Sequence, residues 1–196
     1  MSRYHGITED TYKRFVVDSG QVRMGFVSVA EPGSLLGATR GGATFTIETE
    51  YKDMPVDGAK GPVQGGRRIT KVNVKMAVTL VEWSTDMIKI AMSGSSESLS
   101  VDHDEITRSL QLTDSNYLSN VALIGEVSDP DSGPAIFILK RALCTGNFEA
   151  AMSDSEEAVL KLEFEGHFSS TDLDTEPWSI MWPHDSNPTT TTTAGA

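Results

Sequence analysis

The fold is decided by residues 43–83, which read ATFTIETEYKDMPVDGAKGPVQGGRRITKVNVKMAVTLVEW. Hydrophobic and polar side chains alternate over residues 43–51 and again over residues 69–83, and a period of two predicts a half-buried strand in each. The positions expected to face a core are Phe45, Ile47 and Tyr51 in the first strand and Val72, Val74, Met76, Val78 and Leu80 in the second. The loop between the strands is too long for a simple hairpin turn, and loops of this length commonly carry function.

Composition limits the class of protein. A chain of 196 residues is expected to form one main domain, and its formal net charge of −12 argues against a protein that holds nucleic acid by its phosphates. Cys144 is the one cysteine, so no internal disulfide is possible, and we expect an ordinary buried thiol. No secretion signal and no apolar run of about 18 residues is present, so we expect a soluble protein without a membrane anchor.

The rest of the chain predicts further short strands and one short helix. Ser84 precedes residues 85–92 as a helix N-cap, and Gly94 stands where the chain would leave that helix. The expected strands are 12–17, 22–29, 98–101, 120–127, 135–144 and 157–168, with a strand or a helical turn at 105–112. In the last long strand, Leu160, Leu162, Phe164 and Phe168 are expected to point inward.

A C-terminal arm follows at residues 172–183. It carries Trp178, Ile180, Met181 and Trp182, and exposed tryptophans are costly in water, so we expect these four to dock on their own domain or on a neighbour. The predicted organisation is one β domain with terminal arms over residues 1–183 and a disordered, Thr-rich tail over residues 184–196.

Several motifs invite a chemical interpretation that their context does not favour. The run 102–105, Asp-His-Asp-Glu, has no second His or Cys at ligand spacing, so a solvated turn is favoured over a metal site. Residues 129–133 resemble the start of a calcium loop, but a Gly stands at the fifth loop position and Lys140 at the twelfth, so a hairpin turn is favoured.

No motif in the sequence indicates catalysis or a bound cofactor. The glycine-rich loop at 58–66 leads into a strand and lacks the Lys-Ser/Thr of a phosphate-binding loop, and no Gly-x-Ser-x-Gly elbow is present. We therefore expect a protein that is not an enzyme. A small hydrolase built from scattered Ser, His and Asp remains a distant alternative, since a triad is defined in space.

Residues 37–94 resemble the core of the major tail tube protein of long-tailed, siphovirus-type bacteriophages. The shared features come in order: a Gly-rich entry, GATRGG, a strand, the loop DGAKGPVQGGRR, a long strand and a short helix. Residues 159–166, a strand ending in Phe-Glu-Gly, are similar to the end of the family's domain, with less specificity.

The resemblance implies a mainly β fold: a β-sandwich or partial barrel with one short flanking helix, a long inter-strand loop and extended terminal arms. Six copies would close into a ring, and stacked rings would form the tube through which DNA passes without sequence-specific binding. Further partners would be the tail-tip or baseplate initiator, the tape measure protein and the tail terminator, and the protein would be made in the host cytoplasm and reside in the virion.

Site residues follow from the same resemblance. The loop that stacks on the next ring would use Asp53, Val56, Asp57, Lys60, Pro62, Arg67 and Arg68. The acidic candidates for the lumen are Glu48, Glu50, Glu163 and Glu165, whose alternative interpretation is an ordinary solvated sheet face. Other β-sandwich virion or surface proteins, such as a head-tail completion protein or an immunoglobulin-like adhesin, are the leading alternative class.

Overall fold

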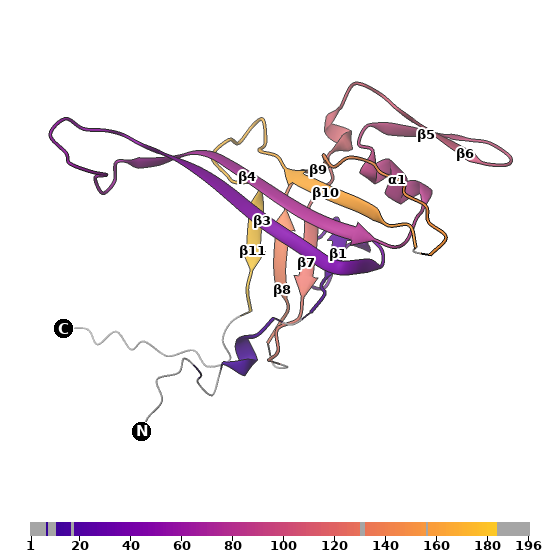
Figure 1. The fold of residues 1–196 in the computed structure, drawn as a ribbon, viewed down its shortest axis with the longest axis horizontal. Coiled ribbons are helices and arrows are strands. Elements are labelled where there is room, and N and C mark those ends of the chain that lie inside the picture. Colours follow the sequence, from indigo (N-terminus) through magenta and orange to yellow (C-terminus); the bar gives the residue numbers. More distant parts are fainter. Residues whose placement is uncertain (1–6, 8–10, 17, 130–131, 156, 184–196) are drawn as a thin grey trace.

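The computed structural model describes residues 7, 11–16, 18–129, 132–155 and 157–183, and these are mainly β-structure (Figure 1). One short α-helix, α1, spans Thr85–Ala91, and two 3-10 turns span Tyr12–Arg14 and Asp114–Asn116. The strands are β1 Gln21–Met24, β2 Ser34–Leu35, β3 Thr39–Asp53, β4 Arg67–Leu80, β5 Ser95–Leu99, β6 Asp104–Arg108, β7 Val121–Gly125, β8 Ala135–Leu139, β9 Ala142–Cys144, β10 Leu160–Gly166 and β11 Trp178–Met181. The predicted fold class, mainly β with one short helix, is confirmed.

Two antiparallel sheets form the body. One has the order β11-β8-β7-β1-β2 and the other the order β3-β4-β10-β9. In Figure 1 the strands of the second sheet cross those of the first at a steep angle. The core between them is filled by the inward side chains of both sheets, among them Val22, Val74, Met76, Val78, Leu80, Val121, Leu139, Leu160, Leu162 and Phe164. The residues of β4 and β10 that the alternation predicted to face the core are therefore the ones that do so.

Strands β3 and β4 form a long hairpin that leaves the body on one side (Figure 1). Within the body the register pairs Phe45 with Met76, and the ring of Phe45 contacts that of Phe137 at 5.6 Å between centroids. The prediction for Tyr51 was wrong, because its side chain is 58% exposed. A register shift between Glu50 and Tyr51 coincides with the point where the hairpin passes beyond the core.

Helix α1 is confirmed. The Ser84 hydroxyl accepts a hydrogen bond from the Met87 N–H at 3.2 Å, which caps the first turn. Gly94 has a φ of +84°, a conformation that favours glycine, and it turns the chain into β5. Strands β5 and β6 then form a separate two-stranded hairpin, and β6 makes residues 105–108 of the ambiguous region 105–112 a strand.

Two of the expected strands near the N-terminus differ from the structure. Residues 12–14 form a 3-10 turn, and an isolated bridge between Val16 and Val127 is the only β-pairing among the described residues of the strand expected at 12–17. The strand expected at 22–29 ends at Met24, because Gly25 adopts a φ of +70° and turns the backbone away.

The strand expected at 135–144 is two strands in two different sheets. It breaks after Leu139, and Arg141 takes a φ of +48°, which bends the chain from β8 in one sheet to β9 in the other. The Arg141 Nε–H donates to the His167 carbonyl at 2.8 Å, and the His167 N–H donates to the Arg141 carbonyl at 3.3 Å. These two bonds hold the corner against the end of β10.

The C-terminal arm docks on its own domain. Strand β11 pairs with β8, and Trp178 packs against the main core. Phe168 lies beyond the end of β10 and is half-buried, so it is not one of the inward residues of that strand. The tail at 184–196, predicted to be disordered, lies outside the described residues.

Candidate functional site: assembly surfaces

Near its far end, the β3–β4 hairpin is held together by an ion pair between Arg67 and Asp53. Arg67 donates to both carboxylate oxygens of Asp53, from Nε to Oδ1 at 2.7 Å and from Nη2 to Oδ2 at 3.1 Å. The guanidinium also lies 5.7 Å from the centroid of the Tyr51 ring, and the Met54 N–H donates to the Gly66 carbonyl at 2.7 Å. The hydrogen bonds from Arg67 lower the pKa of the Asp53 carboxyl, so both groups are charged at neutral pH.

Beyond this closure the loop makes no core of its own. All residues from 51 to 70 are exposed except Gly66, which is half-buried. The seven residues predicted to form the stacking loop all lie at this end of the hairpin: Asp53, Val56, Asp57, Lys60, Pro62, Arg67 and Arg68. Residues 51–71 contain five basic and two acidic side chains, a formal charge of +3 in a chain of net −12. This hairpin end is therefore basic and apolar at once, since Met54, Val56, Val63 and Ile69 are also exposed.

The outer face of the four-stranded sheet holds the four predicted lumen candidates. The register places Glu48, Glu50, Glu163 and Glu165 on this face, opposite the core. Lysines on the same face partly neutralise them: Lys75 Nζ lies 2.9 Å from Glu163 and Lys71 Nζ lies 3.5 Å from Glu50.

The charge of this face is close to neutral. The register adds Lys161 to the two paired lysines, so three ammonium groups stand against four carboxylates. The hydrogen bond to Glu163, followed by the charge of that carboxylate, raises the pKa of Lys75. Sequence analysis identified the glutamates and gave no weight to the lysines between them.

Strand β3 is an open edge of this sheet. In the described part of the chain it pairs with β4 and with no other strand, along most of its 15 residues. The opposite edge is closed, because Ala142 of β9 exchanges two backbone hydrogen bonds with Leu118 and the Cys144 carbonyl accepts from the Ser93 hydroxyl at 3.0 Å. A long unpaired edge can accept a strand from another molecule.

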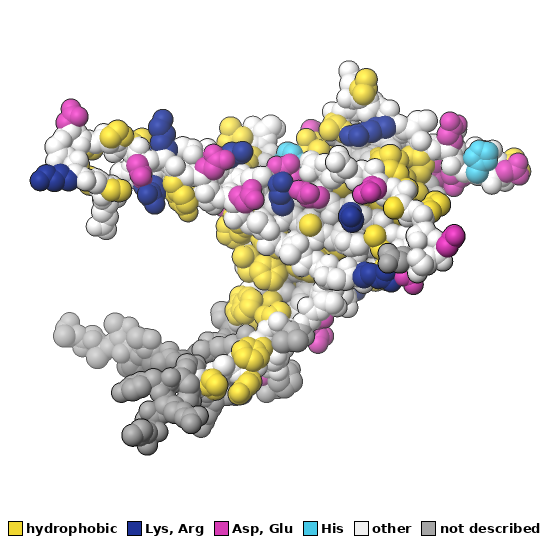
Figure 2. All heavy atoms as spheres, viewed as in Figure 1, with side chains coloured by type: hydrophobic (Ala, Val, Ile, Leu, Met, Phe, Trp, Pro, Cys, Tyr) yellow, Lys and Arg dark blue, Asp and Glu magenta, His cyan; other side chains and the backbone are white. Residues whose placement is uncertain are grey.

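A second open edge belongs to the C-terminal arm. Strand β11 is the last strand of the five-stranded sheet, and Ile180, Met181 and Trp182 are 42–52% exposed. Figure 2 shows hydrophobic side chains gathered over the part of the molecule where β11 and β8 lie. Of the four residues predicted to dock the arm, Trp178 does so, and the other three offer an apolar surface beside it.

The β5–β6 hairpin projects at the other end of the molecule's longest axis (Figure 1). Its tip carries Leu99, 79% exposed, and Val101, 100% exposed, next to three carboxylates, Asp102, Asp104 and Glu105. Residues 102–105 are exposed, as expected, but Asp104 and Glu105 belong to β6, so only the first half of the predicted turn lies between the two strands. The sequence signal for this exposed surface was two large apolar residues, Leu99 and Val101, beside an acidic run.

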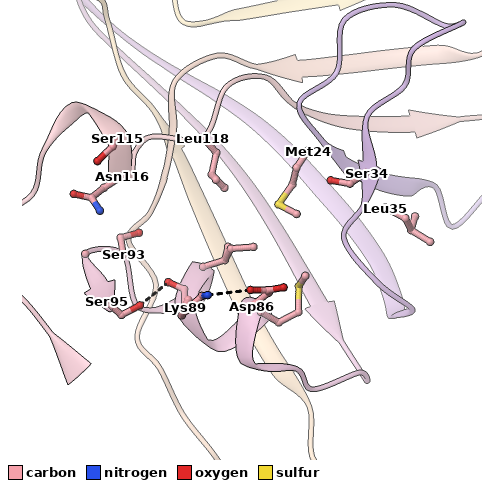
Figure 3. Close-up of a pocket in the computed structure, with 13 residues that line it drawn as sticks. Met24, Ser34, Leu35, Asp86, Lys89, Ser93, Ser95, Ser115, Asn116 and Leu118 are labelled. Atoms are coloured by element: carbon pink, nitrogen blue, oxygen red, sulfur yellow. Dashed lines mark hydrogen bonds and ion pairs between the residues drawn. The ribbon is translucent and has the colours of Figure 1, made fainter. Parts of the chain in front are cut away.

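A shallow groove lies beside α1, between that helix, the edge strand β2 and the turn at 114–116 (Figure 3). Its charged groups pair with one another: Lys89 Nζ lies 3.0 Å from Asp86 and 2.8 Å from Glu97, which lies outside the groove lining. The nearby Cys144 is buried, as expected, and burial raises the pKa of its thiol. Two of the serine hydroxyls in its lining, those of Ser93 and Ser95, donate to the backbone carbonyls of Cys144 and Lys89.

Within the described part of the chain, no three His, Cys, Asp or Glu side chains are grouped so that they could hold a metal ion. The described helices include none with the length and hydropathy required to span a membrane.

Comparison with known proteins gives structural neighbours only. No family model and no curated protein matches the chain. Among solved structures, the chain is similar to a chain of the virion of a native gene transfer agent (GTA) particle, at 11% identity and a TM-score of 0.43 over 83% of this chain and 95% of that one. It is also similar to a chain of the tail of an empty GTA particle with C6 symmetry, at 11% identity and a TM-score of 0.39 over 84% and 95%. Because these scores and identities are low, we base the proposed function on this chain's own residues.

Proposed function

We propose that this protein is a structural virion protein that polymerises as stacked hexameric rings into a phage tail tube, a conduit for genome ejection. It acts without catalysis and resides in the virion after synthesis in the host cytoplasm. Residues 1–183 serve as one tail-tube domain with arms. Its partners are further copies of itself, the tail-tip or baseplate initiator, the tape measure protein and the tail terminator.

The observation that carries the proposal is the β3–β4 hairpin. Residues 51–70, all exposed except Gly66 and closed by the Asp53–Arg67 pair, extend from the body with apolar side chains in solvent. An isolated two-stranded ribbon is marginally stable in water, so a second surface is needed to cover it. The resemblance of residues 37–94 to tail tube proteins implies that this surface belongs to the adjacent ring.

The four-stranded sheet supports a role in a tube wall. One of its faces packs on the core, while the other is polar and carries alternating glutamates and lysines. A face of this kind, turned toward a lumen, offers DNA phosphates no basic patch to bind. The open edges at β3 and β11 are surfaces through which neighbouring copies can continue the sheets around a ring.

Negative-stain electron microscopy of the purified full chain, at rising concentration and two salt levels, tests the proposal. We expect hollow tubes with a regular axial repeat. A variant that lacks residues 56–66 should give none, and a variant that lacks 150–153, in another exposed loop, should still form them. Persistent monomers in the presence of a tail-tip complex, or tubes from the loop-deleted variant, would contradict the proposal.

The lumen assignment has its own test. Replacing Glu48, Glu50, Glu163 and Glu165 by Lys changes the outer sheet face from four carboxylates and three ammonium groups to seven ammonium groups. Tubes should still assemble, and DNA ejection from reconstituted particles should slow because phosphates would now be attracted to the wall. Unchanged ejection would mean that this face does not line the lumen.

A further inference from the structure

We propose that the basic tip of the β3–β4 hairpin in one copy binds the acidic tip of the β5–β6 hairpin in the next copy. The inference rests on the proposed function, because it names the surface that receives the stacking loop. The occupant of each tip is a second copy of this chain, joined head to tail.

The basic end of the β3–β4 hairpin, residues 51–71, forms the basic tip, and at its base it contains a pair of like charges with no ion-pair partner among the described residues. Lys52 and Arg68 are directly opposite in the register of β3 and β4, on one face of the ribbon. No ion pair joins either of them to another residue in the described part of the chain. Like charges in directly opposed positions destabilise a strand pair. A carboxylate from outside would remove that repulsion.

The acidic tip supplies such carboxylates. Residues 99–105 hold three acidic side chains and no Lys or Arg, and Asp102, Asp104 and Glu105 are all exposed. The tip also exposes Leu99 and Val101, which can cover Val56 and Val63 of the opposing loop. Complementary charge around apolar contacts is the ordinary composition of a specific interface.

The positions of the two tips favour a contact between copies. They lie at opposite ends of the longest axis of the molecule (Figure 1), and Figure 2 shows Asp, Glu and His side chains gathered at the β5–β6 end. A contact between two different patches of one protein repeats from copy to copy and builds a ring or a filament. The acidic residues near 149–155 are a less suitable receptor, since the neighbouring Glu157 is already paired with Arg40 and the segment follows Phe148, whose ring contacts Trp83 of the body.

A charge exchange tests the pairing in the assembling full chain. Lys52→Glu with Arg68→Glu should raise the concentration needed for assembly by about tenfold, because attractive contacts become repulsive. Asp104→Lys with Glu105→Lys should have a similar effect. The variant with all four changes should regain most of the lost assembly. If the quadruple variant needs as high a concentration for assembly as the double variants, or if the double variants assemble normally, the pairing is wrong while the tube proposal stands.

Cross-linking gives a second reading that does not require tubes. Gln64 and Ser100 are exposed residues at the two tips, and neither carries charge. A chain with Gln64→Cys and Ser100→Cys, oxidised at high concentration, should give a ladder of multimers. The matched chain with Gln64→Cys and Ala151→Cys, at the acidic loop, should not, and the native chain controls for the buried Cys144. Equal ladders from the two variants, or no ladder from either, would overturn the inference.

Discussion

Replacing Phe164 by Ala should cost most of the stability that one side chain can contribute to this fold. Phe164 is 0% exposed and lies at the centre of the four-stranded sheet, where the register pairs it with Met76 on β4 and with Cys144 on β9. Hydrogen-bonded strands flank it on both sides, so the backbone cannot close over the space left by the ring. A rigid site of this kind retains its cavity.

The expected loss is about 3–5 kcal/mol in the free energy of unfolding, the usual range for a buried Phe changed to Ala. Domains are stable by only about 5–15 kcal/mol, so this one change removes a large fraction of the total. For a chain of this size, each kcal/mol shifts the melting temperature by about 2–4 °C, so we expect a fall of roughly 6–20 °C.

Urea unfolding followed by circular dichroism, at a concentration where sedimentation shows monomers, measures the loss. Lys161→Ala is the matched control, because Lys161 lies on the same strand with its side chain exposed on the opposite face, and it should change stability by less than about 0.5 kcal/mol. A loss below about 1 kcal/mol at Phe164, or equal losses at both sites, would refute the assignment of the inner face of β10 to the core.

Three further outcomes are expected. Because burial raises the pKa of Cys144, its thiol should resist alkylation at pH 8 in the native protein and react once urea unfolds it, as followed by mass spectrometry. Arg141→Val should lower stability by about 1–3 kcal/mol, because a β-branched residue would have to hold the φ of +48° and the bond to His167 would be lost. The Glu126 N–H donates to the Asp18 carboxylate at 3.1 Å and lowers the pKa of that carboxyl in the folded protein. The stabilisation from this hydrogen bond is therefore present above the unfolded pKa and is lost as pH falls through the lower, folded pKa. Asp18→Asn should flatten the acid denaturation profile in that pH range, and an unchanged profile would contradict this assignment.

Much of the four-stranded sheet could be predicted because its strands are half-buried. Side chains of β4 and β10 alternate between the core and a polar face, and that period is visible in the sequence. The position of the loop between β3 and β4 was also predictable, since Gly and Pro mark a loop between two clear strands. The exposure of the loop could be predicted in the same way. The exposure of Tyr51 could not, because alternation does not show where a strand leaves the body.

Other features depend on contacts between distant parts of the chain. The corner at Arg141 lies within a continuous run of mostly apolar residues, and nothing in its local pattern shows that β8 and β9 belong to different sheets. The pairing of Lys75 with Glu163 joins residues 88 positions apart, so the neutralisation of the polar face was not visible to local pattern analysis. The β5–β6 hairpin was ambiguous because its strands are polar and mostly exposed, so no hydrophobic alternation marks them in the sequence.

The shape of the β3–β4 hairpin has a mechanical consequence. Strand β3 alone extends for roughly 50 Å at about 3.3 Å per residue, and its outer part is a ribbon one layer thick. Pulling along such a ribbon loads its cross-strand hydrogen bonds together in shear, whereas bending it across its thin dimension strains few contacts. Joints made of these ribbons would resist extension and yield to curvature. A cylinder assembled through them would keep its length while it flexes.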